Sequence, residues 1–371
     1  MILIDSDAAL VARCQRWAQA PALALDTEFV RTDTYYAQLC LVQVDDGSDP
    51  AVVDALAVHD LEPLLERLRD PQQVKILHSG SQDLEILAPM CDAPVAPLFD
   101  TQRAAEMLGE GEQLSYAALV ERHLGVKLDK SLTRTDWRHR PLRRDEMAYA
   151  AADVSYLRRL YPLLRDALAA RGRLAWLRED CAQLAAPARY QEDPRDAWRR
   201  LKHLPRLPPE AQAAAVALAQ WRELTARGAN RPRRWILSDD ALYALATRRP
   251  HDAAALAAVR EVPASLARHH GGAILRCIAT AHDELPNGAG AAPPLDDEQR
   301  KGLDALRGRL AALAERLEVP RGLLANRSDL ERLVRQGDAS DIPLLHGWRR
   351  RVAAEVLELD GAAPVTASGA G

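Results

Sequence analysis

Four short apolar runs near the start of the chain constrain the fold more than any other feature. Each is bounded by turn-forming residues and is too short for a core helix, so each predicts a β-strand. The runs are PALALDTEF, AQLCLVQVD, PAVVDAL and VKILHSG. Helix-like segments accompany them at 61–70, 83–90 and 143–170. This mixture predicts an α/β domain over residues 1–190, with a sheet covered by helices.

The chain beyond residue 207 contains no convincing strand and predicts only helices. PPEAQAAAVALAQWRELTARG has prolines at its start, helical periodicity, and Gly228 as a stop signal. A stretch rich in Gly and Pro then separates two helical segments. The parts expected after the first domain are a linker at 191–207, an all-α domain at 208–284, a linker at 285–294, a second helical domain at 295–360 and a disordered tail at 361–371.

The two helical domains are similar to each other in sequence. PRRWILSDDALYAL, which starts at Pro232, aligns without gaps with PRGLLANRSDLERL, which starts at Pro320. The proline, the arginine and two helix leucines coincide. We therefore expect two small helical domains rather than one large one, with the second the more divergent.

Composition argues against several classes of protein. The 371 residues carry a formal net charge of −4, so local clusters of charge matter more than the whole-chain balance. The five cysteines lie far apart and form no C-x-x-C pair, which argues against a disulfide scaffold or a structural zinc site. No apolar run approaches the roughly 20 residues of a membrane span. We expect a protein of the cytoplasm with no membrane attachment.

The run LALDTEFVR brings two carboxylates to the end of an apolar strand. Residues i and i+2 of a strand face the same side, so Asp26 and Glu28 point together. Two such charges repel each other and resist burial, and a divalent cation such as Mg²⁺ resolves both problems. A solvated strand end is the alternative interpretation of this pair taken alone.

Two further segments carry candidate ligands. YAAADVSYL places Tyr149 and Asp153 at i and i+4, on one face of a helix, with small alanines between them. ILHSGSQDLEIL places Asp83 after a strand and a glycine turn, at the start of a helix. Each has an ordinary explanation, an amphipathic helix for the first and the helix dipole for the second. The three segments together favour a metal site.

The segments LDTEF, LHSGSQDLEIL and YAAADVSYL resemble the three motifs of the DEDD superfamily of 3′-to-5′ exonucleases. A tyrosine lies four residues before the last aspartate, and Ala148 stands where another branch has histidine, so the chain resembles the tyrosine branch. With LDKSLTRTDWRHRPL and the two helical repeats, the architecture resembles the bacterial ribonuclease D family. This resemblance covers nearly the whole chain. It implies a ribonuclease H-like mixed sheet flanked by helices, followed by two small all-α domains of the HRDC type shared with RecQ-like helicases.

The resemblance also implies a mechanism with two divalent metal ions, Mg²⁺ or Mn²⁺. Asp26 would bridge both ions, Glu28 and Asp153 would complete the site of the ion that activates water, and Asp83 would hold the other ion through water. Tyr149 would orient the attacking water, because a phenol with a pKa near 10 is a weak base at neutral pH. The product would be a nucleoside 5′-monophosphate, released from a free 3′ end.

Other polar residues near the motifs are candidates for further roles. Asp100 is either a fifth acidic residue of the site or, as we expect, the cap of a helix that begins near Thr101. His78 and Gln82 flank Asp83 and are candidates for lining the substrate path.

A basic stretch lies directly before the catalytic helix. Residues 127–144 hold seven Lys and Arg against two Asp. Within this stretch Lys130, Arg134 and Arg138 are candidates for RNA contact, because a basic loop beside the motif helix suits phosphate. A solvated basic loop is the alternative.

The first helical domain is also basic. Residues 195–276 hold fifteen Lys and Arg against seven Asp and Glu. Within them RGANRPRRWIL supplies Arg231, Arg233 and Arg234 beside Trp235. Basic patches with an aromatic residue suit RNA. We expect the arginines to contact RNA and the tryptophan to be a core residue of the domain.

We therefore expect a 3′-to-5′ exoribonuclease that trims the 3′ ends of structured RNA such as tRNA precursors. It would act as a monomer and without a small-molecule cofactor. Two other interpretations stay open: an exonuclease that acts on DNA, and a non-catalytic nucleic-acid-binding adaptor with a decayed nuclease domain. The motifs do not separate RNA from DNA. All four carboxylates and the tyrosine are present, which argues against decay.

Overall fold

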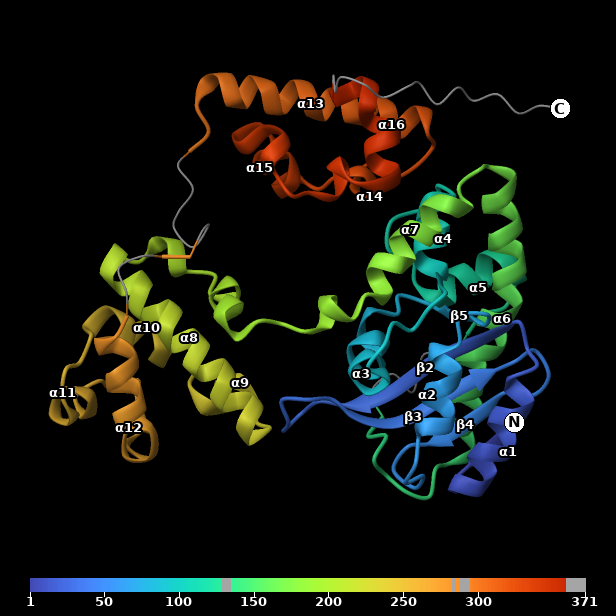
Figure 1. Ribbon diagram of the computed structural model, residues 1–371, viewed down its shortest axis with the longest axis horizontal. Helices are drawn as coiled ribbons and strands as arrows, with labels where there is room; N and C mark the ends of the chain where they lie inside the picture. The colour runs from blue at the N-terminus through green and yellow to red at the C-terminus, as the bar shows by residue number, and fades with distance from the viewer. Residues whose placement is uncertain (129–134, 282–284, 287–293, 358–371) are drawn as a thin grey trace. The chain divides into compact units, whose positions relative to one another are not determined.

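The computed structural model describes residues 1–128, 135–281, 285–286 and 294–357. They form two compact units, which we describe separately (Figure 1). The first unit contains Met1–Phe29, Leu39–Tyr190 and the chain from Leu295 onward. The second contains the short segment Val30–Gln38 and residues Gln191–Pro294. Each unit is thus built from segments that lie far apart in the sequence.

A six-stranded mixed sheet lies in the first unit. The strands are β1 (Ile2–Ile4), β2 (Ala22–Val30), β3 (Gln38–Asp45), β4 (Ala51–Asp54), β5 (Val74–Leu77) and β6 (Leu98–Asp100). Their order is β1-β4-β3-β2-β5-β6. The β1–β4, β2–β5 and β5–β6 pairs are parallel, whereas β3 and β4 are antiparallel. The four predicted strands are β2 to β5, and the two edge strands are too short to show a sequence pattern.

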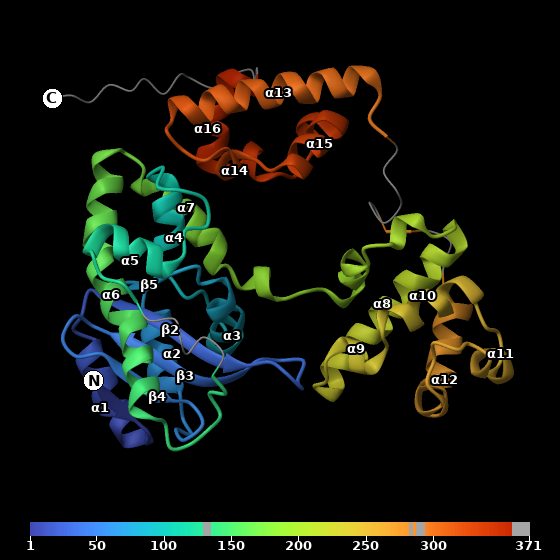
Figure 2. The same cartoon turned by 180° about the vertical axis from the view of Figure 1, so that it is seen from behind.

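Helices cover both faces of this sheet. They are α1 (Asp7–Trp17), α2 (Glu62–Arg69), α3 (Ser81–Cys91), α4 (Thr101–Met107), α5 (Tyr116–Leu124), α6 (Arg144–Ala170) and α7 (Leu174–Ala185). α1, α2 and α3 pack in a row on one face, and α6 crosses the other against β4 and β5 (Figures 1 and 2). The apolar strand residues form the core between these layers, and Leu23, Val42 and Ile76 are fully buried.

The helices after residue 294 pack onto the same unit. They are α13 (Asp297–Arg316), α14 (Arg321–Leu324), α15 (Arg327–Gln336) and α16 (Gly347–Leu357). Trp348 of α16 stacks on Trp176 of α7, with ring centroids 4.4 Å apart. Asp180 of α7 accepts hydrogen bonds from the Trp348 indole and the Arg349 guanidinium, at 2.6 to 2.8 Å. The expected second helical domain therefore shares one hydrophobic core with the sheet-containing part.

The second unit is helical. Its helices are α8 (Pro209–Ala229), α9 (Arg233–Ile236), α10 (Asp239–Arg248), α11 (Ala253–Ala257) and α12 (Ala264–Ala279), with α8 packed against α9, α10 and α12. Residues 191–207, which we expected to act as a linker, instead join the core of this unit through Trp198, Leu201 and Leu204. The expectation of a linker is wrong for this part, because these apolar side chains gain burial against the helical unit.

The helices after residue 294 repeat part of the second unit. In each case a proline precedes a four-residue helix, α9 or α14, and a ten-residue helix follows, α10 or α15. Ser238 caps α10 and Asn326 caps α15, each by accepting a hydrogen bond from a backbone N–H. The sequence alignment of Pro232 with Pro320 therefore falls on matching elements.

Three expectations of the sequence concern other features of the chain. All five cysteines are free thiols, as their spacing predicts. Among the residues that the structure describes, no helix has the length and apolar character needed to cross a membrane. The predicted tail at 361–371 and most of the predicted linker at 285–294 lie outside the described residues.

Candidate active site

β2 carries two carboxylates at the end of its apolar run. The strand lies in the middle of the sheet, between β3 and β5, so Leu23 to Leu25 are fully buried. Asp26 and Glu28 are half-buried, whereas Thr27 between them is buried. Oxygens of Asp26 and Glu28 lie within 4.8 Å of each other. This is the placement that the alternation of side chains along a strand predicts.

Helix α6 brings a third carboxylate to this pair. An oxygen of Asp153 lies within 4.8 Å of the oxygens of Asp26 and Glu28. Ala150, on the preceding turn of α6, is fully buried, and its small side chain permits close packing of the helix. Tyr149 is half-buried one turn before Asp153 on the same helix. Besides burial, the negative charge of Asp153 is close enough to raise the pKa of the Tyr149 hydroxyl.

Asp83 joins this group from the first turn of α3. It is 7% exposed and accepts a hydrogen bond from the Thr27 hydroxyl. It also lies close enough to Asp26 to repel it. Thr27 therefore ties β2 to α3, a contact for which the sequence carries no local signal.

Burial and mutual repulsion make the four carboxylates unfavourable to ionise. Burial is the main cause that raises the pKa of Glu28 to about 8, the pKa of Asp153 to about 7 and the pKa of Asp83 to about 6. Burial, followed by the charges of the other three carboxylates, raises the pKa of Asp26 well above its usual range. A divalent cation would remove the repulsion, and carboxylate oxygens are the donors that Mg²⁺ and Mn²⁺ prefer. The residues present therefore fit a divalent-metal centre.

The surroundings of Tyr149 keep its hydroxyl protonated. Burial, and then the negative charges of Asp153, Glu28 and Asp26, raise its pKa above the usual value. The indole of Trp137, a buried residue of the loop before α6, lies against the phenol, with ring centroids 6.1 Å apart. Sequence reasoning assigned no role to this tryptophan. The segment TDWRHRPL shows no periodicity that would reveal which way the ring points.

Asp100 is a helix cap, as expected. It caps α4 by accepting hydrogen bonds from two backbone N–H groups of its first turn. The same carboxylate accepts hydrogen bonds from the backbone of Ser79 and Gly80, in the turn that leads into α3. It therefore helps to position Asp83.

His78 lines a polar pocket of about 540 Å³ together with Ser79, Gln102 and Tyr116. The centroid of its ring lies 5.5 Å from the ring centroid of Tyr116, which lines the same pocket. Tyr116 donates a hydrogen bond to the carbonyl of Ala152, the residue before Asp153. This position is compatible with the predicted place of His78 on the substrate path. Gln82 is exposed on the first turn of α3.

The basic stretch before α6 is described only in part. Lys130 and Arg134 lie outside the described residues. Arg138 is exposed and pairs at 2.9 Å with an aspartate two residues before it. The neighbouring Arg140 instead forms a two-pronged ion pair with the buried Asp54, at 2.5 and 2.6 Å. Arg140 therefore anchors the loop to the sheet.

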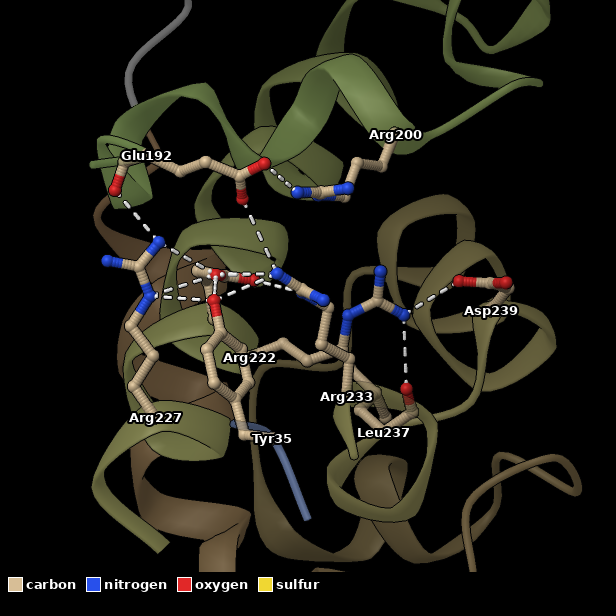
Figure 3. A network of polar contacts seen from close by, with 9 residues as sticks. Tyr35, Glu192, Arg200, Arg222, Arg227, Arg233, Leu237 and Asp239 are labelled. Atoms are coloured by element: carbon tan, nitrogen blue, oxygen red, sulfur yellow. Dashed lines mark hydrogen bonds and ion pairs between the residues drawn. The ribbon is translucent and has the colours of Figure 1, made fainter. Parts of the chain in front are cut away.

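The three arginines predicted to contact RNA in the second unit have different surroundings. The guanidinium of Arg233 turns inward and bonds Glu223 and the hydroxyl of Tyr35 (Figure 3). Arg231 and Arg234 are exposed. The internal partners of Arg233 make it a structural residue, so the prediction of phosphate contact is better supported for Arg231 and Arg234.

Trp235 does not lie in the core of the second unit. The residue is 60% exposed, so the expectation of a core tryptophan is wrong. The core position nearby belongs to Leu237, which is 1% exposed. Trp235 stands in a helix of only four residues. So short an element has no periodicity that would show which way its side chains face.

Comparisons with known proteins show where these features recur. Residues 1–169 match a family described as 3′-5′ exonuclease, and residues 211–278 match the HRDC domain. Ribonuclease D of Acidiphilium cryptum is 40% identical over 354 residues, which cover 94% of this chain and 90% of that protein. Ribonuclease D of Pseudomonas paraeruginosa is 39% identical over 363 residues, 95% of this chain and 96% of that protein.

One solved structure is similar along nearly its whole length. The crystal structure of Escherichia coli RNase D, described as an exoribonuclease involved in structured RNA processing, matches with a TM-score of 0.84. It is 34% identical, and the match covers 96% of this chain and 97% of that one. This likeness confirms the predicted mixed sheet flanked by helices and followed by helical structure of the HRDC type.

The match over residues 1–169 identifies the class of the protein as a 3′-5′ exonuclease, and an HRDC domain follows the exonuclease domain. The similarity to relatives runs through both parts. The chain belongs to the ribonuclease D family of 3′-5′ exoribonucleases. The HRDC match falls on the first of the two predicted helical domains.

Proposed function

We propose that this chain removes nucleotides one at a time from a free 3′ end of RNA and releases nucleoside 5′-monophosphates, with Mg²⁺ or Mn²⁺ at its site. The observation that carries the proposal is the convergence of Asp26, Glu28 and Asp153, whose oxygens lie within 4.8 Å of one another. Such a group is unfavourable without a cation and is a strong ligand set with one.

Each carboxylate has a distinct place in the proposed site. All three other carboxylates repel Asp26, and we propose Asp26 as the ligand shared between two ions. Glu28 and Asp153 would complete the site of one ion, and Asp83 would hold the second through water. Two divalent ions bound there would supply an activated water and neutralise the charge that develops on the phosphate.

Tyr149 would act as a hydrogen-bond donor rather than as a base. Its raised pKa keeps the hydroxyl protonated at neutral pH. From α6 the hydroxyl would hold the attacking water in line with the scissile bond, and the buried indole of Trp137 would fix the ring. Positioning of this kind contributes to rate without any change in the charge of the phenol.

We propose structured RNA, such as tRNA precursors, as the substrate class. Escherichia coli RNase D is described as involved in structured RNA processing. The exposed Arg138, Arg231 and Arg234 would contact phosphates away from the 3′ end. We assign the helices after residue 294 as a second HRDC-like domain, because α14 and α15 repeat the order, lengths and capping of α9 and α10.

A single-stranded RNA with a labelled 3′ end, titrated with Mg²⁺ and separately with Mn²⁺, tests the proposal. We expect metal-dependent, stepwise release of labelled mononucleotide. The Asp26→Asn variant should keep its circular-dichroism spectrum and lose turnover, because the shared ligand is lost. Asp166→Asn, which changes an exposed aspartate of α6, is the matched control and should cleave normally.

Two results would contradict the proposal. Tight RNA binding without any release would favour a non-catalytic adaptor. Equal or faster release from a DNA strand of the same sequence would remove the assignment of RNA as the substrate.

A further inference from the structure

Two aromatic side chains of the second unit are unusually exposed. Among the described residues, Trp235 at 60% and Tyr36 at 56% are the most exposed large hydrophobic side chains. Scattered single hydrophobic residues on a surface need no explanation. Tyr36 and Trp235 belong to the same compact unit although they are far apart in the sequence. Hydrogen bonds join the two segments that carry them.

One asparagine joins the two segments. Asn230 ends α8 in the left-handed conformation, with φ of 47°, and its side chain projects to the tip of the segment Val30–Gln38. Its Oδ1 atom accepts hydrogen bonds from the backbone N–H groups of both Tyr35 and Tyr36, each at 3.1 Å. Trp235 follows five residues later in the chain. The two exposed rings are therefore carried by segments that meet at one point.

A partly buried network of hydrogen bonds holds this junction together. The hydroxyl of Tyr35 donates to Glu223 and accepts from Arg227 at 2.9 Å and from Arg233 at 2.8 Å (Figure 3). The Arg233 guanidinium also lies over the Tyr35 ring, 4.6 Å from its centroid. Tyr35 therefore attaches the segment Val30–Gln38 to the helices of the second unit. The neighbouring Tyr36 remains exposed, with its ring edge-on to Tyr35 at 4.8 Å.

A cation lies beside the exposed indole. The guanidinium of Arg231 lies 5.7 Å from the centre of the Trp235 ring, and Arg231 is exposed. The Arg234 side chain is 79% exposed, with Asp239 as a partner at 3.1 Å. Residues 230–235 contain three arginines and no acidic residue. Flat rings beside exposed cations suit a chain that alternates bases with phosphates.

We propose that Tyr36 and Trp235 form a stacking platform for unpaired bases of a single-stranded RNA segment, with Arg231 and Arg234 on the adjoining phosphates. This inference deepens the proposed function and rests on it for the choice of RNA. The platform would bind RNA without base specificity, because every base has a face that can stack. The platform lies in the same unit as the HRDC domain, so that unit would hold the RNA strand.

Binding of a fluorescent oligouridylate to the full chain, in a chelator so that no hydrolysis occurs, tests the platform. Trp235→Ala and Tyr36→Ala should each weaken binding by about 5- to 150-fold, the range for loss of one stacked base. Their salt dependence should match that of the wild type, because no charge is lost. Arg231→Gln and Arg234→Gln should instead flatten the salt slope, by about 0.7 for each lost phosphate contact.

Three controls make the result specific. Trp235→Phe keeps a ring and should retain most of the affinity. Leu224→Ala removes another exposed apolar side chain of the same unit, 52% exposed, and should bind as the wild type does. An abasic oligonucleotide should bind the wild type and Trp235→Ala equally, because it has no base to stack.

The platform assignment fails if both alanine variants bind oligouridylate as tightly as the wild type does, or if Leu224→Ala loses as much affinity as they do. A surface that instead serves a protein partner would give the first of these results. Mononucleotide release by the wild type in Mg²⁺ is measured separately. Absence of release would contradict the proposed function, whereas the chelator binding data would still decide the platform.

Discussion

We expect the Glu223→Gln variant to lose stability in a pH-dependent way. Glu223 is 2% exposed and accepts hydrogen bonds from Tyr35, Arg227 and Arg233, three of the residues labelled in Figure 3. Burial alone would raise its pKa, but the bonds from Arg233, Tyr35 and Arg227 outweigh burial and lower the pKa from 4.5 to about 2. Glutamine keeps the size of the side chain and removes its charge.

The size of the effect follows from these two pKa values. A decrease from 4.5 to about 2 on folding stabilises the folded state by about 3 kcal/mol at neutral pH. Because the folded-state pKa is the lower of the two, the stabilisation is complete above the unfolded-state pKa and is lost as the pH falls through the folded-state pKa. The variant should therefore be less stable by about 3 kcal/mol at pH 7 and by only about 1 kcal/mol near pH 3.

Urea unfolding of the full chain at both pH values measures this difference. Hydrogen exchange in α8 assigns the relevant transition to the second unit, because a chain with two units does not unfold in one step. Glu261→Gln is the matched control from the same unit, since Glu261 forms a more exposed ion pair with Arg248 at 3.4 Å. It should cost less than about 0.5 kcal/mol. A loss for Glu223→Gln that is equal at pH 7 and pH 3 would refute the reasoning.

Two further variants test other parts of the chain. Tyr149→Phe should slow single-turnover cleavage about 10- to 1000-fold while metal binding, followed by calorimetry, survives; an unchanged rate would remove Tyr149 from the mechanism. Asp180→Ala leaves Arg349 and the Trp348 indole without their shared acceptor, and both partners of the ion pair are nearly buried. It should lower stability by about 3 to 5 kcal/mol in thermal unfolding, and a change below about 1 kcal/mol would show that the other contacts of α16 are sufficient to hold it without this ion pair.

Local patterns were sufficient to predict the elements that carry the acidic residues. The alternation of side chains along β2 places Asp26 and Glu28 on one side, and the helical repeat places Tyr149 and Asp153 on one face of α6. Neither pattern specifies that these faces meet. Their convergence depends on the order of the strands, which is a property of the whole sheet, and only the resemblance to a known family supplied it in advance.

Contacts between distant segments escaped prediction for the same reason. The bond between Tyr36 and Asn230 joins residues 194 positions apart. No periodicity in either segment points to the other. Sequence reasoning also treated Arg233 as one of three equivalent arginines, but only a partner such as Tyr35, far away in the chain, decides which of them turns inward. Charge counts identify a basic region without identifying the side chains that are available to a ligand.

The net charge of −4 therefore conceals two regions of opposite character, an acidic site around Asp26 and a basic second unit. Without a metal, the carboxylates around Asp26 offer no cation to a phosphate backbone, so affinity measured in a chelator reports mainly on the basic second unit. With Mg²⁺ present, the same carboxylates hold a charge that attracts phosphate. An RNA with a hydrolysis-resistant 3′ end allows both affinities to be compared. If the two regions act independently, Trp235→Ala should weaken binding by the same factor in chelator and in Mg²⁺, whereas Asp26→Asn should remove only the gain that Mg²⁺ brings.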